Sequence, residues 1–412
     1  MMHLRPILAT LRKHKLTAVL LTVQVALTLA IVCNVAFMVG SRIQFMRMPS
    51  GLAENRISLI TSTSIDSKDS ARARQMADLA ALRAIPGVQS AVAVSESLPL
   101  SGGVDSYGVC PSLEDLHKAM QARSADGTGC VEPNAYWGSP GERETLGIQL
   151  VAGRDFRAED YVDDGKPAVA IVTRALARHL WPQQAALGQS MYLGSGNPIR
   201  VVGVVDPLLP PFLKTNGAAQ YSMLWPRWPG GDTVTYALRS SPGARHRVMN
   251  AARAALVRLD PQRIIDPERM QTYSQMRRDY FARDLTMIGL LVAAALGLLF
   301  VTALGIAGLA SFWVSQRRRS IGIRRAVGAS RRDILRYFQV ENFLIVSVGV
   351  VLGAVLAVGL NLWLMQHYEL THLPWHYLPS AALAVWLLGQ LAVLSPAMRA
   401  ARVPPVEATR SG

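Results

Sequence analysis

Four long stretches without a charged residue limit what this chain can fold into. They lie between Lys15 and Arg42, between Asp284 and Arg317, between Glu341 and Glu369, and from Leu370 to Met398, where Tyr377 to Leu394 is the apolar part. A helix needs about 20 mostly apolar residues to cross the hydrocarbon core of a bilayer. Buried helices of soluble proteins rarely run this long without a charge. The sequence therefore predicts an α-helical integral membrane protein with four transmembrane helices.

The first stretch has the alternative interpretation of a cleaved signal peptide. Its apolar run exceeds the roughly 7–15 residues of a signal-peptide core, and no small-x-small cleavage pattern follows it. We therefore expect an uncleaved membrane anchor.

The positive charge of the chain is concentrated beside the spans. The net charge of +15 is typical of nucleic-acid-binding proteins. However, 15 basic and three acidic residues lie in the N-terminal tail, the loop between the second and third spans, and the C-terminal tail. Short loops rich in Lys and Arg stay in the cytosol. This distribution predicts cytoplasmic termini, an extracytoplasmic domain between helices 1 and 2, and no nucleic-acid partner.

The predicted boundaries follow from the charges and the apolar stretches. The spans are predicted at 16–41, 284–316, 342–366 and 377–395. The remaining segments are a cytoplasmic amphipathic segment on the membrane lipids (1–15), an outer domain with stalk helices at both ends (42–283), a cytoplasmic elbow (317–341), a short outer loop (367–376) and a cytoplasmic tail (396–412).

The outer domain mixes two sequence patterns at short spacing. "DSARARQMADLAALRAI" is amphipathic with a helical period, and "VQSAVAVSES" alternates as a strand does. "IRVVGVV" and "TVTYALRS" also read as strands, and "GARHRVMNAARAALVRLD" reads as a helix. The sequence therefore predicts a large α+β domain of two lobes.

The outer domain also contains two cysteines. Cys110 and Cys130 lie twenty positions apart, so they are a candidate disulfide if the compartment is oxidising. The alternative is a pair of free thiols. Cys33 lies within the first span, where a small packing residue is expected.

The sequence contains no recognised catalytic motif. G-x-x-x-x-G-K-[ST], G-x-S-x-G and H-E-x-x-H are all absent, so no catalytic residue and no bound cofactor are expected. "LSGG" at Leu100 to Gly103 is similar to part of an ATPase signature, but its place in the outer domain indicates coincidence. His367, His372 and His376 lie close in sequence. Pro374 breaks any helix that would align the last two, so no metal site is expected.

The loop between the second and third spans is predicted to form a helical elbow. It contains eight arginines, and Gly328 is a candidate end for the helix that leaves the second span. Ser330 and Asp333 form an S-x-x-D start signal for the next helix. Such an elbow would dock a cytosolic partner; the alternative is a solvated loop with arginines on lipid headgroups. Further along, Gly349, Gly353 and Ala357 have the small-xxx-small spacing that favours close helix packing.

Three segments of the chain resemble a known family. "QRRRSIGIRRAVGASRRDILRYFQVENFLI" resembles the signature loop of FtsX/MacB-type ABC transporter permeases, and "SPAMRAARVPPVEATR" resembles their C-terminal end. In the outer domain, "LGIQLVAGRDFRAED" and "PAVAIVTRALARHLWPQQAALGQSMYL" resemble the MacB-like periplasmic core domain.

The resemblance implies the permease subunit of an ABC transporter in the cell inner membrane. A separate cytosolic ABC ATPase would bind ATP, and the permease would relay its motion to the periplasmic domain. Such a subunit would pair with a second protomer, identical or a paralogue. It would also work with a periplasmic membrane-fusion protein and an outer-membrane channel to export a small molecule, a peptide or a lipid-linked substrate.

The resemblance also assigns residues to ATPase coupling. By position these are Ile321, Gly322, Ile323, Arg324, Arg325, Ala326, Gly328, Ala329, Asp333 and Glu341. The chain departs from the family at Ser320, where an acidic residue is usual. Two other functions fit the same architecture: an FtsX-like regulator of periplasmic cell-wall hydrolases, and a non-ABC four-span sensor or scaffold.

Overall fold

A computed structural model describes most of the chain. The described residues are 15–65, 71–103, 105–125, 127–162, 167–213, 220–368 and 372–402, without the side chains of Arg318, Arg319, Arg324, Arg325 and Tyr368. The predicted amphipathic segment and most of the C-terminal tail lie outside these residues. The chain divides into a membrane unit, Met1–Arg47 with Asp284–Gly412, and an outer domain, Met48–Arg283.

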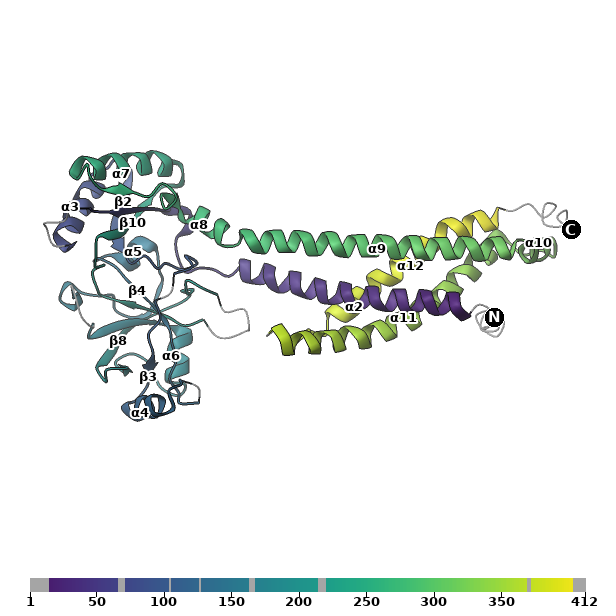
Figure 1. Ribbon diagram of the computed structural model, residues 1–412, viewed down its shortest axis with the longest axis horizontal. Coiled ribbons are helices and arrows are strands. Elements are labelled where there is room, and N and C mark those ends of the chain that lie inside the picture. Colours follow the sequence, from purple (N-terminus) through teal and green to yellow (C-terminus); the bar gives the residue numbers. More distant parts are fainter. Residues whose placement is uncertain are drawn as a thin grey trace. The chain divides into compact units, whose positions relative to one another are not determined.

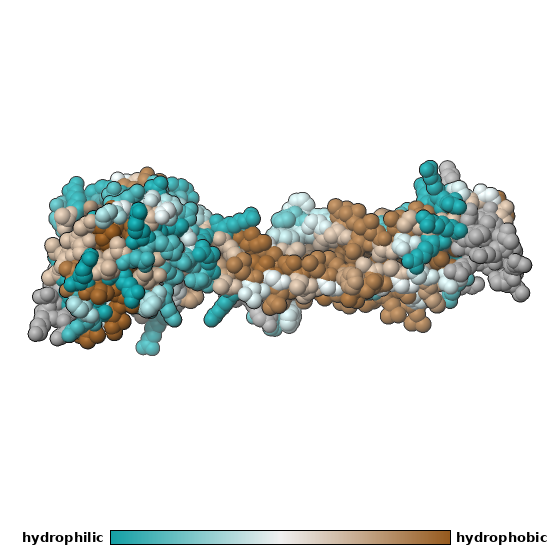
Figure 2. Space-filling model, turned by 90° about the horizontal axis from the view of Figure 1, so that it is seen from above, coloured by the Kyte–Doolittle hydropathy of each residue, from teal (hydrophilic) through white to brown (hydrophobic). Residues whose placement is uncertain are grey.

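The membrane unit consists of long apolar helices. They are α2 (Lys15–Met46), α9 (Ala282–Gln316), α11 (Arg331–Tyr368) and α12 (Tyr377–Ala401), together with the short α10 (Arg318–Ala326). The four long helices are apolar enough to cross a membrane, and apolar side chains dominate the face of them that Figure 2 shows. The predicted fold class, four spans with an α+β domain between the first and second, is confirmed.

Polar side chains link the membrane helices to one another. Thr28 of α2 and Thr302 of α9 share a hydrogen bond of 2.7 Å between their buried hydroxyls. The Asn34 amide donates to the Ala357 carbonyl of α11 at 3.1 Å, and the Asn342 amide donates to the Gly389 carbonyl of α12 at 3.0 Å. Because lipid tails are as apolar as leucine, such bonds and close packing must replace the hydrophobic effect in holding the helices together.

The first sheet of the outer domain is antiparallel, in the order β11-β1-β10-β2 with β12 beside β1. Its strands are β1 (Ile57–Thr63), β2 (Val88–Val94), β10 (Thr233–Ser240), β11 (Ile264–Ile265) and β12 (Gln271–Thr272). Helices α3 (Ala71–Arg83) and α7 (Arg245–Leu259), the latter after the turn η3 (Pro242–Ala244), cover one face (Figure 1). Ile60 and Tyr236 of the sheet are buried there against Leu82 and Val248.

The second sheet is mixed, in the order β3-β7-β8-β6-β9-β4 with β5 beside β8. Its strands are β3 (Val109–Cys110), β4 (Asn134–Trp137), β5 (Leu150–Gly153), β6 (Val169–Thr173), β7 (Ser190–Leu193), β8 (Pro198–Val205) and β9 (Ser222–Trp225). The intervening helical segments are α4 (Leu113–Ala122), α5 (Glu142–Leu146), η2 (Ala158–Asp160) and α6 (Arg174–Leu180). Leu176 of α6 is buried against this sheet.

The two sheets are joined through backbone hydrogen bonds. Ser139 N donates to the Ala93 carbonyl at 2.7 Å, and Ser95 N donates to the Trp137 carbonyl at 2.8 Å. Gly138 lies between these bonds, where a Cβ would come within 2.7 Å of the Ala93 oxygen. Only glycine therefore fits this close approach without a shift. An apolar core shared by both sheets lies beside the junction.

The two ends of the outer domain are fastened to each other. Arg277 of α8 (Tyr273–Tyr280) forms an ion pair with Glu54 of η1 (Glu54–Arg56) and donates to the Met48 carbonyl at 2.6 Å. The Ser274 hydroxyl donates to the Glu54 carbonyl at 3.1 Å. The segment that enters the domain is therefore bonded to the segment that leaves it.

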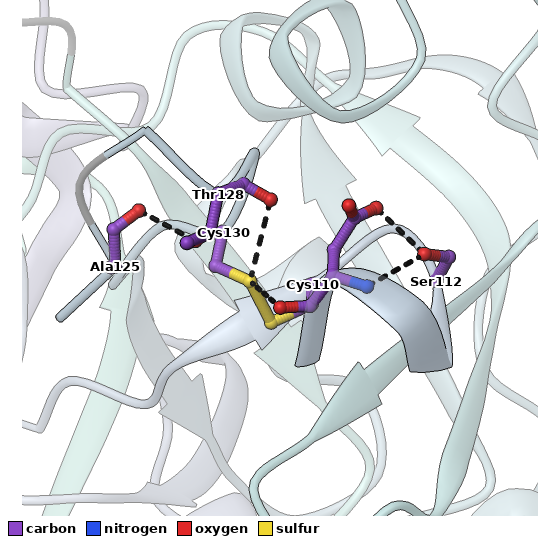
Figure 3. Close-up of a disulfide and its surroundings, with 6 residues drawn as sticks. Cys110, Ser112, Ala125, Thr128 and Cys130 are labelled. Atoms are coloured by element: carbon purple, nitrogen blue, oxygen red, sulfur yellow. Dashed lines mark hydrogen bonds between the residues drawn. A yellow bond between two sulfur atoms is a disulfide. The ribbon is translucent and has the colours of Figure 1, made fainter. Parts of the chain in front are cut away.

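Cys110 and Cys130 form a disulfide that closes the segment around α4 (Figure 3). Ser112 is the N-cap of this helix and accepts from Asp115 N at 3.1 Å. Leu116 packs against the two cysteines in a small separate cluster. Few apolar contacts hold this segment, so the covalent link matters to it.

Replacing both Cys110 and Cys130 by Ser is expected to destabilise the segment they enclose by about 3 kcal/mol, since the open loop has more conformational freedom when unfolded. Hydrogen exchange should rise within α4 and remain unchanged in α7. Reducing the wild-type protein should reproduce the effect, and Cys33→Ser should not. Unaltered exchange in α4 would contradict this role.

Glu142, at the start of α5, is a buried acid. Its side chain is 3% exposed, and among the described residues its Oε1 has no hydrogen-bond partner. Burial raises the pKa of the Glu142 carboxyl to about 8, with a smaller contribution from the Asp155 carboxylate. The folded domain therefore holds a proton here that the unfolded chain releases above its ordinary pKa of 4.5.

The Glu142 carboxyl is expected to make stability fall as pH rises from about 4.5 to 8, by up to about 1.4 kcal/mol per pH unit, because the unfolded chain binds fewer protons. Urea unfolding of the wild type and of Glu142→Gln, followed by tryptophan fluorescence, measures this. The free-energy difference, variant minus wild type, should grow over this range. A constant difference would show that Glu142 titrates normally.

Candidate functional site: the elbow

The elbow, residues 317–341, consists of two helical segments with a glycine turn between them. The prediction that the helix from the second span runs on to Gly328 is wrong in one respect, because α9 ends at Gln316 and α10 begins afresh at Arg318. Gly328 has a φ of +105°, and the turn that contains it follows α10. A non-glycine residue would be strained in this left-handed conformation.

The start of α11 has the predicted capping arrangement. The Ser330 hydroxyl donates to Asp333 Oδ2 at 2.6 Å, and Ser330 N donates to the same oxygen at 3.0 Å. Asp333 N in turn donates to the Ser330 hydroxyl at 3.2 Å. These reciprocal bonds satisfy backbone donors that a helix start leaves free. Asp333 thus stabilises the elbow from within.

An apolar stripe fixes the elbow to the membrane unit. Ile321 of α10 and Ile334 and Phe338 of α11 are each no more than 6% exposed. They belong to the same buried cluster as Trp313 of α9 and Val393 of α12. Gly322 is buried as well. Of the predicted coupling residues, Ile321 and Gly322 therefore lie on the buried side of the elbow.

A buried ion pair closes the elbow. Arg317 donates from two nitrogens to the two carboxylate oxygens of Glu341, at 2.8 and 3.1 Å. The Glu341 side chain is 2% exposed and that of Arg317 is 17% exposed. Bidentate geometry of this kind is the strongest form of an Arg–carboxylate contact. It joins the residue after α9 to α11 at a point about three turns from the start of that helix.

The sequence prediction placed Glu341 at the coupling site and gave Arg317 only a topological role. One signal pointed to the pair: an acid on an apolar helix at membrane depth needs a basic partner. Eight arginines compete for that role in sequence. Only the fold distinguishes Arg317 from the rest.

The opposite side of the elbow presents apolar side chains to the surroundings. Ile323 is 52% exposed and Val327 is 84% exposed. Ala326 and Gly328 are also exposed, and Ala329 is half-buried. A hollow of about 210 Å³ lies between α10 and α11, and its lining includes Ala329 together with the buried Ile321 and Ile334. We call Ile323 and Val327 the tip.

The predicted packing residues of α11 lie against α2. A Cβ on Gly349 would come within 2.7 Å of Val25, and one on Gly353 would come within 2.8 Å of the Ala26 carbonyl. Ala357 is fully buried, and its carbonyl accepts from Asn34. The small residues thus allow α2 and α11 to touch along their backbones.

Two family models match most of the chain. Residues 20–263 match the MacB-like periplasmic core domain, and residues 292–405 match the FtsX-like permease C-terminal model. The first of these covers more than half of the sequence. The chain therefore belongs to the family of FtsX/MacB-type ABC transporter permeases and is a multi-pass membrane protein.

Curated relatives align along nearly the whole chain. Macrolide export ATP-binding/permease protein MacB 1/2 of Paracoccus denitrificans is 27% identical, with 99% of this chain and 58% of the relative covered. Uncharacterized ABC transporter permease YvrN of Bacillus subtilis is 23% identical, with 99% of each covered. The chain thus spans less than two thirds of the length of this MacB relative. Among solved structures, the periplasmic region of MacB from Actinobacillus actinomycetemcomitans aligns with 56% of this chain and 94% of that chain, at 14% identity and a TM-score of 0.32.

Glu341→Ala is expected to destabilise the membrane unit by about 3–5 kcal/mol, because it leaves the Arg317 guanidinium partly buried and unpaired. Thermal unfolding in detergent measures the loss. Combining Arg317→Met with Glu341→Leu should recover most of it, since neither charge then remains. Arg332→Ala, an exposed change on the same helix, should cost less than about 0.5 kcal/mol. A double variant as unstable as Glu341→Ala would contradict the assignment.

Proposed function

We propose that this chain is the permease subunit of a MacB/FtsX-type ABC transporter that relays the motion of a separate cytosolic ATPase to its outer domain. The ATPase binds and hydrolyses ATP, and the permease itself holds no cofactor. Family membership and the elbow support this proposal. The relatives named for macrolide export favour an exported small molecule, peptide or lipid-linked substrate.

The observation that carries the proposal is the two-sided character of the elbow. Its inner side is anchored by the Arg317–Glu341 pair and by buried Ile334 and Phe338. Its outer side presents the apolar tip, Ile323 and Val327, to the surroundings. A coupling contact requires an exposed apolar surface on a segment that is firmly packed against the membrane helices. A force that a partner exerts on the tip would then displace these helices and would not be absorbed by a flexible loop. Burial of the tip would supply the affinity.

The direction of the relay follows the chain. From the elbow, α11 runs as one helix and packs tightly on α2, whose sequence leads into the outer domain at Met48. On the other side of the elbow, α9 connects to α8 and therefore to the Arg277–Glu54 ion pair. Two helices thus enter and leave the outer domain at bonded residues.

The proposed topology places the elbow and both termini in the cytoplasm and residues 42–283 in the periplasm. The excess of basic residues beside the spans supports it. The Cys110–Cys130 disulfide in the outer domain also fits an oxidising compartment. In this arrangement a second protomer, identical or a paralogue, and a membrane-fusion protein with its outer-membrane channel complete the transporter.

Val327→Asp is expected to weaken association with the partner ABC ATPase by at least about tenfold, because a charge replaces an apolar contact group. Co-purification and the ATPase rate with and without permease measure it. Val327 is 84% exposed, so the fold should be unaffected. Met120→Asp, at an exposed position of α4, is the matched control and should keep full stimulation. Equal stimulation by both variants would refute docking at the tip.

A further inference from the structure

A cleft of about 820 Å³ lies within the outer domain, and its lining residues include none of the elbow or of the disulfide segment 110–130. Its floor is the open face of the first sheet, opposite the face that α3 and α7 cover. Its walls are the loop 95–103 and the segment that follows β9. Sites for small molecules commonly measure about 300–1,000 Å³. The proposed function assigns no role to this cleft.

The floor of the cleft carries hydroxyl groups where a core would carry methyl groups. Thr61 of β1 and Thr235 of β10 are 4% and 6% exposed, and their hydroxyls share a hydrogen bond of 2.9 Å. A second cross-strand pair, Thr63 and Thr233, lies next to it, also at 2.9 Å. Each hydroxyl can donate one bond and accept two. After pairing, the floor still offers hydrogen-bonding capacity to a ligand.

The loop 95–103 holds a fixed conformation as a wall of the cleft. Leu100 has a φ of +63°, which is rare for a residue other than glycine. Its N–H donates to the Pro210 carbonyl at 3.2 Å, and the Tyr273 hydroxyl donates to the Pro99 carbonyl at 2.7 Å. At Gly103 a Cβ would come within 2.6 Å of the Ser97 hydroxyl. Backbone strain that neighbouring bonds maintain is characteristic of preorganised ligand sites.

The charges around the cleft are balanced. Glu96 and Asp105 provide two acids, and Arg227 and Arg269 provide two bases. Arg269 lies 3.7 Å from Glu96, and the Arg227 guanidinium lies over the Trp137 ring at 5.6 Å. Positive and negative side chains are equal in number among these residues. The cleft therefore favours neither a strongly anionic nor a strongly cationic ligand.

The lining also includes small apolar surfaces. Leu59, Val94 and Met276 lie among the hydroxyls, and Trp137 borders them. We propose that this cleft binds an uncharged, hydroxyl-rich ligand of the saccharide class. Sugar hydroxyls would bond to the threonine and serine groups and to the charged side chains, and sugar C–H faces would cover the apolar patches. The proposal does not depend on coupling to an ATPase.

Titration calorimetry on the full-length protein in nanodiscs tests this proposal. The probes are chitotriose and maltotriose, with trialanine and inorganic phosphate as other ligand classes. At least one saccharide should bind saturably at one site per chain, and the tripeptide and phosphate should not. No saccharide binding, or binding of trialanine or phosphate instead, would overturn the proposal.

Two glycines give a matched pair of blocking variants. Gly230 lines the cleft, and Gly194 lies in the turn after β7; a Cβ at either position has no atom within 4 Å. Gly230→Trp should weaken saccharide binding at least tenfold by filling the cleft, whereas Gly194→Trp should leave it unchanged. Equal affinities in the two variants would place the binding elsewhere.

A second variant tests the chemistry of the floor. Combining Thr61→Val with Thr235→Val keeps the shape and removes both hydroxyls, so no partner is left unpaired. Thr28→Val with Thr302→Val makes the same change in the membrane helices and serves as the control. The double variant at Thr61 and Thr235 should weaken saccharide binding at least tenfold, and the double variant at Thr28 and Thr302 should leave it unchanged. An unchanged affinity in the first pair would exclude recognition by the hydroxyl floor.

Discussion

The ion pair between Arg317 and Glu341 determines how the elbow is built. A carboxylate that is 2% exposed on an otherwise apolar helix is stable only with a partner, and Arg317 provides two hydrogen bonds to it. The pair fixes the chain after α9 onto α11. The buried stripe of Ile321, Ile334 and Phe338 packs into the core of the membrane unit. The tip lies outside this core and is exposed. The ion pair and the buried stripe together therefore fix the position of the elbow.

The membrane unit combines this pair with unusually close helix contact. Gly349 and Gly353 bring the backbone of α11 against α2, and Asn34 adds a hydrogen bond at the next turn. At Gly353 the atoms of α2 that a Cβ would approach include the Ala26 carbonyl oxygen and Cα, which are backbone atoms. In the proposed relay, a displacement of α11 would pass to α2 through this close backbone contact. The proposed relay depends on this contact.

The sequence predicted features that depend on local chemistry or on length. The four spans follow from uninterrupted apolar runs, and the turn at Gly328 and the cap at Ser330 follow from residue type and spacing. The partner of Glu341 was not predictable, because eight arginines are equivalent until the fold selects Arg317. The cleft was not predictable either. Its floor joins Thr61 to Thr235 across a sheet, and such long-range pairing leaves no local signal.

The bonds among Met48, Glu54 and Arg277 have a consequence for how this architecture arose. They hold the first and last segments of the outer domain together, so the domain departs from the membrane helices and returns to them at one place. A module with adjacent ends can be inserted into a host chain without rethreading it. Evolution can therefore exchange one such module for another while the helical host remains the same, and expression of residues 48–283 alone would yield a self-contained folding unit.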